Sequence, residues 1–140
     1  MWYFHVQDGK WIEGPTLRLA RRFAGCGTFK DGQDTYILAV GGIAGKAMKS
    51  SEMLKIGGNS WFDGPNMSFR SEETIVSSLA YSLEGEVAWV FGGTNTDVGA
   101  DSDFIFRLHC QGKPEDGQCQ WIEHGMRLKI RRDWATAITF

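Results

Sequence analysis

Two pairs of adjacent glycines, each ending an apolar run, recur about fifty residues apart in this chain. Residues 36–40 lead into Gly41 and Gly42, and residues 87–91 lead into Gly92 and Gly93. Short runs rich in valine and aromatic residues, bounded by glycine, are typical of β-strands. Self-similarity at this period predicts an array of repeated units, with function residing in loops rather than in one catalytic pocket.

A tryptophan, a turn and one or two arginines form a second repeated pattern around the glycine pairs. Each tryptophan offers a large apolar face for packing between sheets. The three copies are Trp11 with Gly14-Pro15 and Arg21-Arg22, Trp61 with Gly64-Pro65 and Arg70, and Trp121 with Gly125-Met126 and Arg131-Arg132.

Each unit is expected to contain four antiparallel strands, with the glycine pair after the second strand and the tryptophan on the fourth. Turn sequences such as Asp8-Gly9 and Glu84-Gly85 separate the strands. Residues 16–23 are expected to form a loop. The predicted strands are 3–6, 11–13, 23–29, 35–40, 51–56, 61–63, 74–82, 87–91, 104–109, 120–123 and 135–140.

This ordered set of features, present twice at similar spacing, resembles the kelch repeat, which forms the blades of β-propellers. The resemblance implies an all-β chain that is an incomplete ring. Its expected divisions are the end of one blade at 1–13, complete blades at 14–63 and 64–123, and the start of another blade at 124–140. The second complete blade carries an insertion at 110–119, and the third unit has Gly125-Met126 where the others have Gly-Pro.

Charge and hydropathy exclude two classes of partner. The chain has 140 residues, with 15 basic and 17 acidic side chains and a net charge of −2, so it lacks the basic surplus of a nucleic-acid binder. No apolar stretch approaches the roughly 18 residues of a membrane helix, and the first residues do not resemble a secretory signal. We therefore expect neither nucleic acid nor membrane as a partner.

The cysteines and histidines are not expected to hold a metal. His109 and Cys110 are adjacent on a predicted strand and should point to opposite faces, and their spacing to Cys119 and His124 fits no common zinc pattern. Cys110 and Cys119 flank the insertion at facing positions, which favours a disulfide; two reduced, buried thiols are the alternative. Cys26 is expected in the core. A disulfide would favour an extracellular location, and its absence the cytoplasm.

No cofactor is predicted. Residues 41–46 are one residue short of a phosphate-binding loop, and Ala47 stands where that loop needs serine or threonine. The copper oxidases built on kelch propellers need a tyrosine–cysteine pair with further tyrosine and histidine ligands, which His5, His109 and His124 do not supply. Accordingly no catalytic residue and no enzymatic activity are expected. An oxidase-like fragment and a structural fragment without independent activity remain the alternatives.

The resemblance implies a protein-interaction module whose partner binds loops at one end of the propeller. Arginines that open the innermost strands often face that end, and the matching residues are Arg22, Arg70 and Arg132. Their guanidinium groups suit an acidic peptide segment, since they form paired hydrogen bonds with carboxylates. The alternative is that these arginines pack between blades. Self-association through the open edges of the incomplete ring is also expected.

Overall fold

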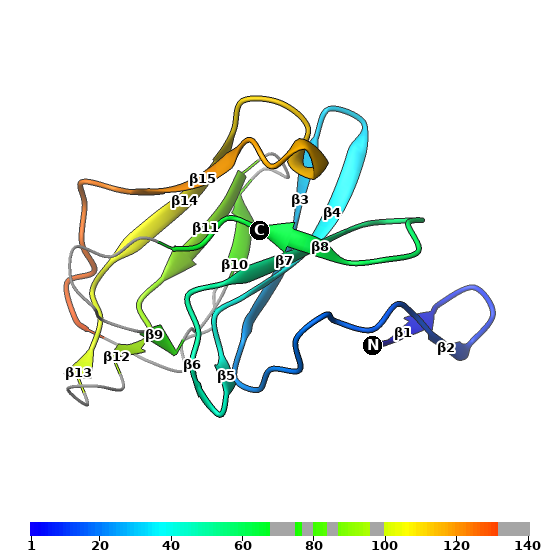
Figure 1. Cartoon of the computed structure of the whole chain (residues 1–140), viewed down its shortest axis with the longest axis horizontal. Coiled ribbons are helices and arrows are strands. Elements are labelled where there is room, and N and C mark those ends of the chain that lie inside the picture. The colour runs from blue at the N-terminus through cyan, green and yellow to red at the C-terminus, as the bar shows by residue number, and fades with distance from the viewer. Residues whose placement is uncertain (68–74, 77–79, 84–86, 96–99, 132–140) are drawn as a thin grey trace.

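A computed structural model describes residues 1–67, 75–76, 80–83, 87–95 and 100–131 (Figure 1). These residues form an all-β structure of several antiparallel sheets, none of which closes into a barrel. Within them the one helical element is a 3-10 turn, η1 (Pro114–Asp116), and no helix is long and apolar enough to cross a membrane. The all-β class predicted from the sequence is confirmed.

The first sheet has the strand order β3-β4-β7-β8, and every neighbouring pair is antiparallel. Gly32 provides the positive φ of the turn between β3 and β4, and Gly57 that of the turn after β7. The glycine pair at 41–42 follows β4, as the sequence predicts. The strands are β3 (Gly25–Asp31), β4 (Asp34–Val40), β7 (Ser51–Lys55) and β8 (Phe62–Gly64).

The second sheet repeats this order as β10-β11-β14-β15, again antiparallel throughout. Its second strand ends at the glycine pair 92–93, and its fourth strand carries Trp121. The strands are β10 (Ala80–Leu83), β11 (Val87–Phe91), β14 (Ile105–Cys110) and β15 (Cys119–Glu123). The two sheets therefore share one architecture.

Smaller elements flank the two sheets. An N-terminal hairpin pairs β1 (Trp2–His5) with β2 (Lys10–Glu13) across a turn that contains Gly9 at positive φ. Residues 14–24 lie outside the named strands and include the predicted loop at 16–23, with a single bridge at Arg22; β3 begins at Gly25, two residues later than predicted. Short strands extend the connections: β5 (Ile43–Ala44), β6 (Lys46–Ala47), β9 (Ile75–Val76), β12 (Thr94–Asn95) and β13 (Ala100–Asp101).

The main core lies between the two sheets. Alternation along β4 directs Leu38 and Val40 toward the second sheet, while Ile37 and Ala39 face the N-terminal hairpin. Facing them from the second sheet are Ala88, Val90, Phe106, Leu108 and Trp121. A smaller cluster covers the opposite face of the first sheet, where Leu54, Ala39 and Trp61 pack against Met1 and Leu17.

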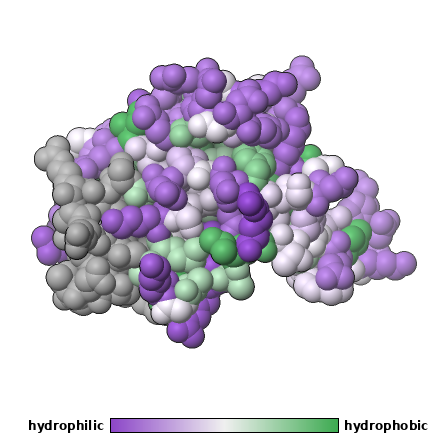
Figure 2. All heavy atoms as spheres, viewed as in Figure 1, coloured by the Kyte–Doolittle hydropathy of each residue, from purple (hydrophilic) through white to green (hydrophobic). Residues whose placement is uncertain are grey.

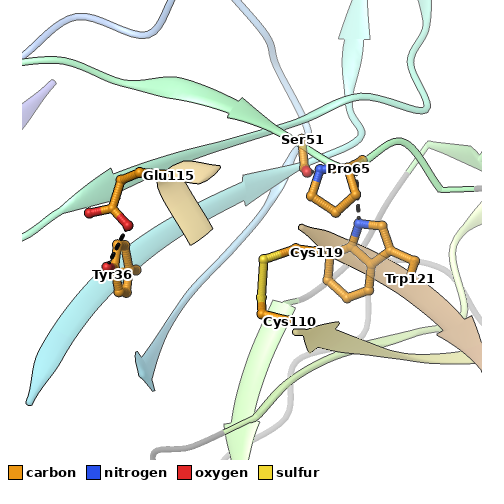
Figure 3. The surroundings of a disulfide bond; sticks show 7 residues. All are labelled: Tyr36, Ser51, Pro65, Cys110, Glu115, Cys119 and Trp121. Atoms are coloured by element: carbon orange, nitrogen blue, oxygen red, sulfur yellow. Dashed lines mark hydrogen bonds between the residues drawn. A yellow bond between two sulfur atoms is a disulfide. The ribbon is translucent and has the colours of Figure 1, made fainter. Parts of the chain in front are cut away.

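One contact recurs at both inter-sheet boundaries. The indole N–H of Trp61 donates to the carbonyl of Pro15 over 3.0 Å. The indole N–H of Trp121 donates to the carbonyl of Pro65 over 3.1 Å, and Figure 3 shows this second contact. Each acceptor follows the last strand of the preceding sheet or hairpin. The tryptophan of one unit is thus fixed to the turn of the unit before it, with its ring buried and its polar atom satisfied.

The predicted disulfide joins Cys110 and Cys119, which are directly opposite each other on β14 and β15. It closes the loop that contains η1, and Glu115 of this turn accepts a 2.8 Å hydrogen bond from the hydroxyl of Tyr36 on the first sheet. Burial, and then the nearby Glu115 carboxylate, raise the pKa of Tyr36 above its ordinary value. The closed loop therefore links the second sheet to the first.

Cys26 is exposed, so its predicted place in the core is wrong. It lies opposite Ala39 on the face of the first sheet that looks toward the N-terminal hairpin. This hairpin supplies two strands rather than four, and they do not extend over β3 within the described part of the chain. The predicted strand at 135–140 lies outside the described residues.

We predict that Trp61→Ala destabilises the fold far more than Trp2→Ala. Trp61 is 5% exposed and its indole is hydrogen-bonded, whereas Trp2 is 61% exposed. Truncating a buried tryptophan typically costs about 3–5 kcal/mol, and a surface substitution about 0.5 kcal/mol or less. Urea unfolding of both variants measures the difference. Equal losses would contradict the packing described above.

We also predict one titratable thiol, Cys26, in unreduced protein, and three after reduction. Breaking the cross-link frees a short loop, and the lost chain constraint corresponds to about 2–3 kcal/mol of unfolding free energy. Thiol titration under denaturing conditions, together with urea unfolding with and without reductant, checks both numbers. Three reactive thiols in native-source protein would refute the disulfide.

Candidate partner-binding loops

The connections that leave β4 and β11 project at the lower end of Figure 1, and we call this the loop end. Its described residues are 20–24, 41–50 and 92–95. Both glycine pairs lie here, and all four glycines have positive φ, from 64° at Gly92 to 111° at Gly93. The chain leaves each second strand through a conformation that other residues adopt only with strain. Sequence analysis located these exits.

Gly42 is also a point of close backbone approach. A Cβ atom at this position would lie 2.7 Å from the carbonyl oxygen of Arg22 and 3.1 Å from the Cα of Ala24. Arg22 and Ile43 form two backbone hydrogen bonds beside it, over 3.1 and 2.8 Å. Gly42 thus lets the segment that enters β3 lie directly against the segment that leaves β4.

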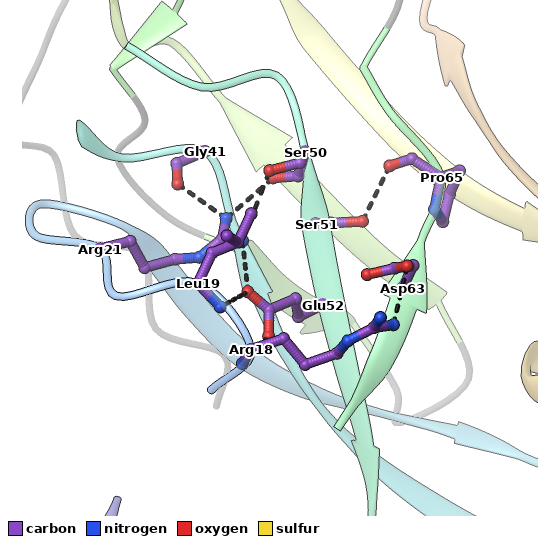
Figure 4. A network of polar contacts seen from close by, with 9 residues as sticks. All are labelled: Arg18, Leu19, Arg21, Gly41, Ser50, Ser51, Glu52, Asp63 and Pro65. Carbon is purple, nitrogen blue, oxygen red and sulfur yellow. Dashed lines mark hydrogen bonds and ion pairs between the residues drawn. The ribbon is translucent and has the colours of Figure 1, made fainter. Parts of the chain in front are cut away.

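The side chain of Arg21 is buried beside the loop end, and both of its terminal guanidinium nitrogens are hydrogen-bonded within the fold (Figure 4). Its guanidinium donates to the carbonyls of Gly41 and Ser50, each over 2.9 Å, and to the carboxylate of Glu52 over 2.6 Å. Both charged side chains are only 1% exposed. A buried ion pair needs such additional hydrogen bonds to offset its loss of hydration.

Glu52 receives further donors from the loop that precedes β3. The backbone N–H groups of Arg18 and Leu19 donate to its two carboxylate oxygens, over 2.6 and 3.2 Å. The Arg18 side chain forms a 2.8 Å ion pair with Asp63 on the neighbouring strand. These contacts fasten residues 18–21 to β7 and β8, and they set the position of the next residue, Arg22.

Arg22 has the opposite environment. Its side chain is exposed, and within the described residues it forms no ion pair with a carboxylate. Its guanidinium carbon lies 5.6 Å from the ring centroid of Phe23, a residue whose backbone has a positive φ of 56°. Non-glycine residues in this conformation cost about 1–3 kcal/mol and are concentrated at functional sites.

The structure thus separates two adjacent arginines that share one sequence signal. Sequence analysis assigned Arg22 either to partner binding or to packing between units; the neighbouring Arg21 is buried within the first unit, against Gly41, Ser50 and Glu52. Sequence analysis did not identify Glu52, because nothing in the sequence indicates that a single glutamate on a strand pairs with an arginine thirty-one residues away. Arg70 and Arg132, the other predicted partner-binding residues, lie outside the described residues.

The arginines near the end of the described chain are paired. Arg127 donates to Glu123 over 2.6 Å and to Asp103 over 3.5 Å, and its guanidinium carbon is 3.8 Å from the ring centroid of Phe104. Arg131 lies 3.9 Å from Asp103. These two side chains are therefore engaged with neighbouring carboxylates, unlike that of Arg22.

A groove of about 690 Å³ separates the N-terminal hairpin from the first sheet. Figure 2 shows the hairpin as a lobe beside the main body. The groove is lined mainly by apolar side chains and glycine, including Tyr3, Ile37 and Leu54. Among the described residues no group of three His, Cys, Asp or Glu side chains is arranged to hold a metal ion.

No family model matches the chain, and a search of curated proteins found no match.

We predict that Gly42→Ala is more destabilising than Gly45→Ala. Both glycines have positive φ, but a Cβ at Gly45 would have no atom within 4 Å, so that variant carries only backbone strain, about 1–2 kcal/mol. At Gly42 the same strain is joined by a collision with backbone, which adds about 1–3 kcal/mol. Thermal and urea unfolding of the two variants measure the difference. Indistinguishable stabilities would show that residues 22–24 do not approach Gly42 closely.

Proposed function

We propose that this chain is part of a kelch-type β-propeller that acts as a protein-interaction module and binds an acidic peptide segment at the loop end. The kelch assignment is supported by two four-stranded meanders with the same strand order, each with a positive-φ glycine pair after its second strand. The recurrence of the tryptophan-to-carbonyl contact at both boundaries supports it further. In this proposal the two sheets are successive propeller blades.

The observation that carries the binding proposal is the contrast between Arg21 and Arg22. Arg21 is buried and holds the loop by four hydrogen bonds, so the loop is fixed before any partner arrives. Arg22 follows directly and presents an exposed guanidinium without a carboxylate partner in the described structure. A preorganised cation loses less conformational freedom on binding than one carried on a mobile loop.

The chemistry of Arg22 selects the class of partner. A guanidinium forms two parallel hydrogen bonds with a carboxylate, and these bonds are stronger than those between neutral groups. Lys46 adds a second exposed cation on the hairpin that β5 and β6 form at this end. The exposed ring of Phe23 lies beside Arg22 and offers apolar surface to the same ligand. An extended peptide with glutamate or aspartate next to an apolar residue fits this arrangement.

The test is an array of synthetic peptides that contain one to four acidic residues, probed with the purified chain. We expect selective binding of acidic peptides, weaker binding as salt is added, and roughly a tenfold or greater loss of affinity in Arg22→Ala. Lys30→Ala is the matched control, because it removes an exposed cation from the far end of β3.

Folding and binding are separated by a third variant. Arg21→Ala leaves Glu52 buried without its counter-charge and should lower the melting midpoint, whereas Arg22→Ala should leave that midpoint unchanged. Equal affinities of wild type, Arg22→Ala and Lys30→Ala for the selected peptides would overturn the assigned role of Arg22. An array without any acidic preference would overturn the proposed partner class.

A further inference from the structure

The N-terminal hairpin carries an exposed aromatic surface on the side away from the first sheet. Tyr3 faces the first sheet and lines the groove, so alternation along β1 places Trp2 and Phe4 on the other side. Trp11 is opposite Phe4 in the ladder, and their rings lie 5.5 Å apart between centroids. We call Trp2, Phe4 and Trp11 the N-face.

The equivalent residues of the other units are buried. Trp121 is paired with Leu108 as Trp11 is with Phe4, and both Trp121 and Leu108 are 5% exposed. Trp11 is 66% exposed and Phe4 47%. The indole N–H of Trp121 has an acceptor in Pro65, while that of Trp11 has none within the described part of the chain. The N-face therefore corresponds to the surface that Leu108 and Trp121 pack against the first sheet, but on the N-terminal hairpin it is exposed.

The complementary half lies at the opposite end of the described structure. Ala88 and Val90 pack against the first sheet, so Trp89 and Phe91 point to the outer side of the second sheet. Arg107 is opposite Trp89 in the ladder and shares that side. We call Trp89, Phe91 and Arg107 the C-face. Leu38, Val40 and Met53 are their equivalents on the first sheet, and all three are 0% exposed.

We propose that the N-face of one copy of this chain docks on the C-face of a second copy. The contact continues the packing that already exists inside one chain, where Leu108 and Trp121 cover the corresponding side of the first sheet. In the proposed contact the indole N–H of Trp11 donates to the backbone carbonyl of Gly125. Gly125 is exposed and lies four residues after Trp121, as Pro15 lies four residues after Trp11 and Pro65 four residues after Trp61.

The C-face differs from the equivalent surface of the first sheet at Arg107, and this difference suits a second copy of the chain as partner. Arg107 replaces the buried methionine of the first sheet, and the partner copy would place aromatic rings over it. A guanidinium on the face of a tryptophan is stabilised by the negative charge of the ring face. A second copy thus supplies apolar area, a hydrogen-bond donor and a partner for the cation from one surface.

The association is heterologous, since two different faces meet, and it therefore forms rings or filaments rather than a dimer with one self-matched patch. This proposal does not depend on peptide binding at the loop end, because neither face includes Arg22. A failure of one proposal leaves the other standing.

The experiment is sedimentation velocity of the purified chain across a dilution series. We expect concentration-dependent association that Trp11→Ala weakens by roughly tenfold or more, as does Arg107→Glu. Ile56→Ala is the control for loss of an exposed apolar side chain, and Lys30→Glu is the control for reversal of an exposed charge. Both controls should associate like the wild type, and all four variants should keep the wild-type melting midpoint.

A mixing experiment tests the head-to-tail geometry. Trp11→Ala retains a competent C-face and Arg107→Glu a competent N-face, so an equimolar mixture should form a 1:1 complex and nothing larger. A wild-type chain that is monomeric at every concentration would overturn the proposal and leave these faces to another protein. Association that both variants preserve, or a mixture that remains monomeric, would overturn it equally.

Discussion

The fold depends on covering both faces of a four-stranded sheet with apolar side chains. Such a sheet carries a row of side chains on each side, and neighbouring layers stabilise it by removing the apolar rows from water. The first sheet is covered by the second sheet on one side and, except over β3, by the N-terminal hairpin on the other. The indole-to-carbonyl hydrogen bonds set the alignment of these layers, because each indole finds its acceptor only in one position.

Covalent and ionic links then fix segments that the apolar packing leaves undetermined. The disulfide holds the loop from which Glu115 reaches Tyr36, and the Arg21–Glu52 pair holds the loop that precedes β3. The disulfide closes a local loop that carries the long-range Tyr36–Glu115 contact, whereas the Arg21–Glu52 pair itself joins positions thirty-one residues apart. Of these two links, the Arg21–Glu52 pair lies beside the loop end and holds the segment that carries Arg22.

Much of this arrangement could be predicted from the sequence because its signals are local. Glycine pairs after apolar runs predicted the strand exits, and two cysteines flanking an insertion predicted the disulfide, since facing positions on paired strands follow from the register. Properties that depend on distant partners could not be predicted. Cys26 is exposed because the N-terminal hairpin does not cover β3. Arg21 differs from Arg22 through partners twenty to thirty-one residues away, Gly41, Ser50 and Glu52.

The tryptophan contact has a direction, because each unit donates from its own last strand to the turn of the unit before it. A series of such contacts therefore has two different ends, and each added unit leaves one end of each kind. No single contact in the series therefore specifies how many units an assembly contains. That number is set by geometry alone, through the angle by which each sheet is rotated from its neighbour.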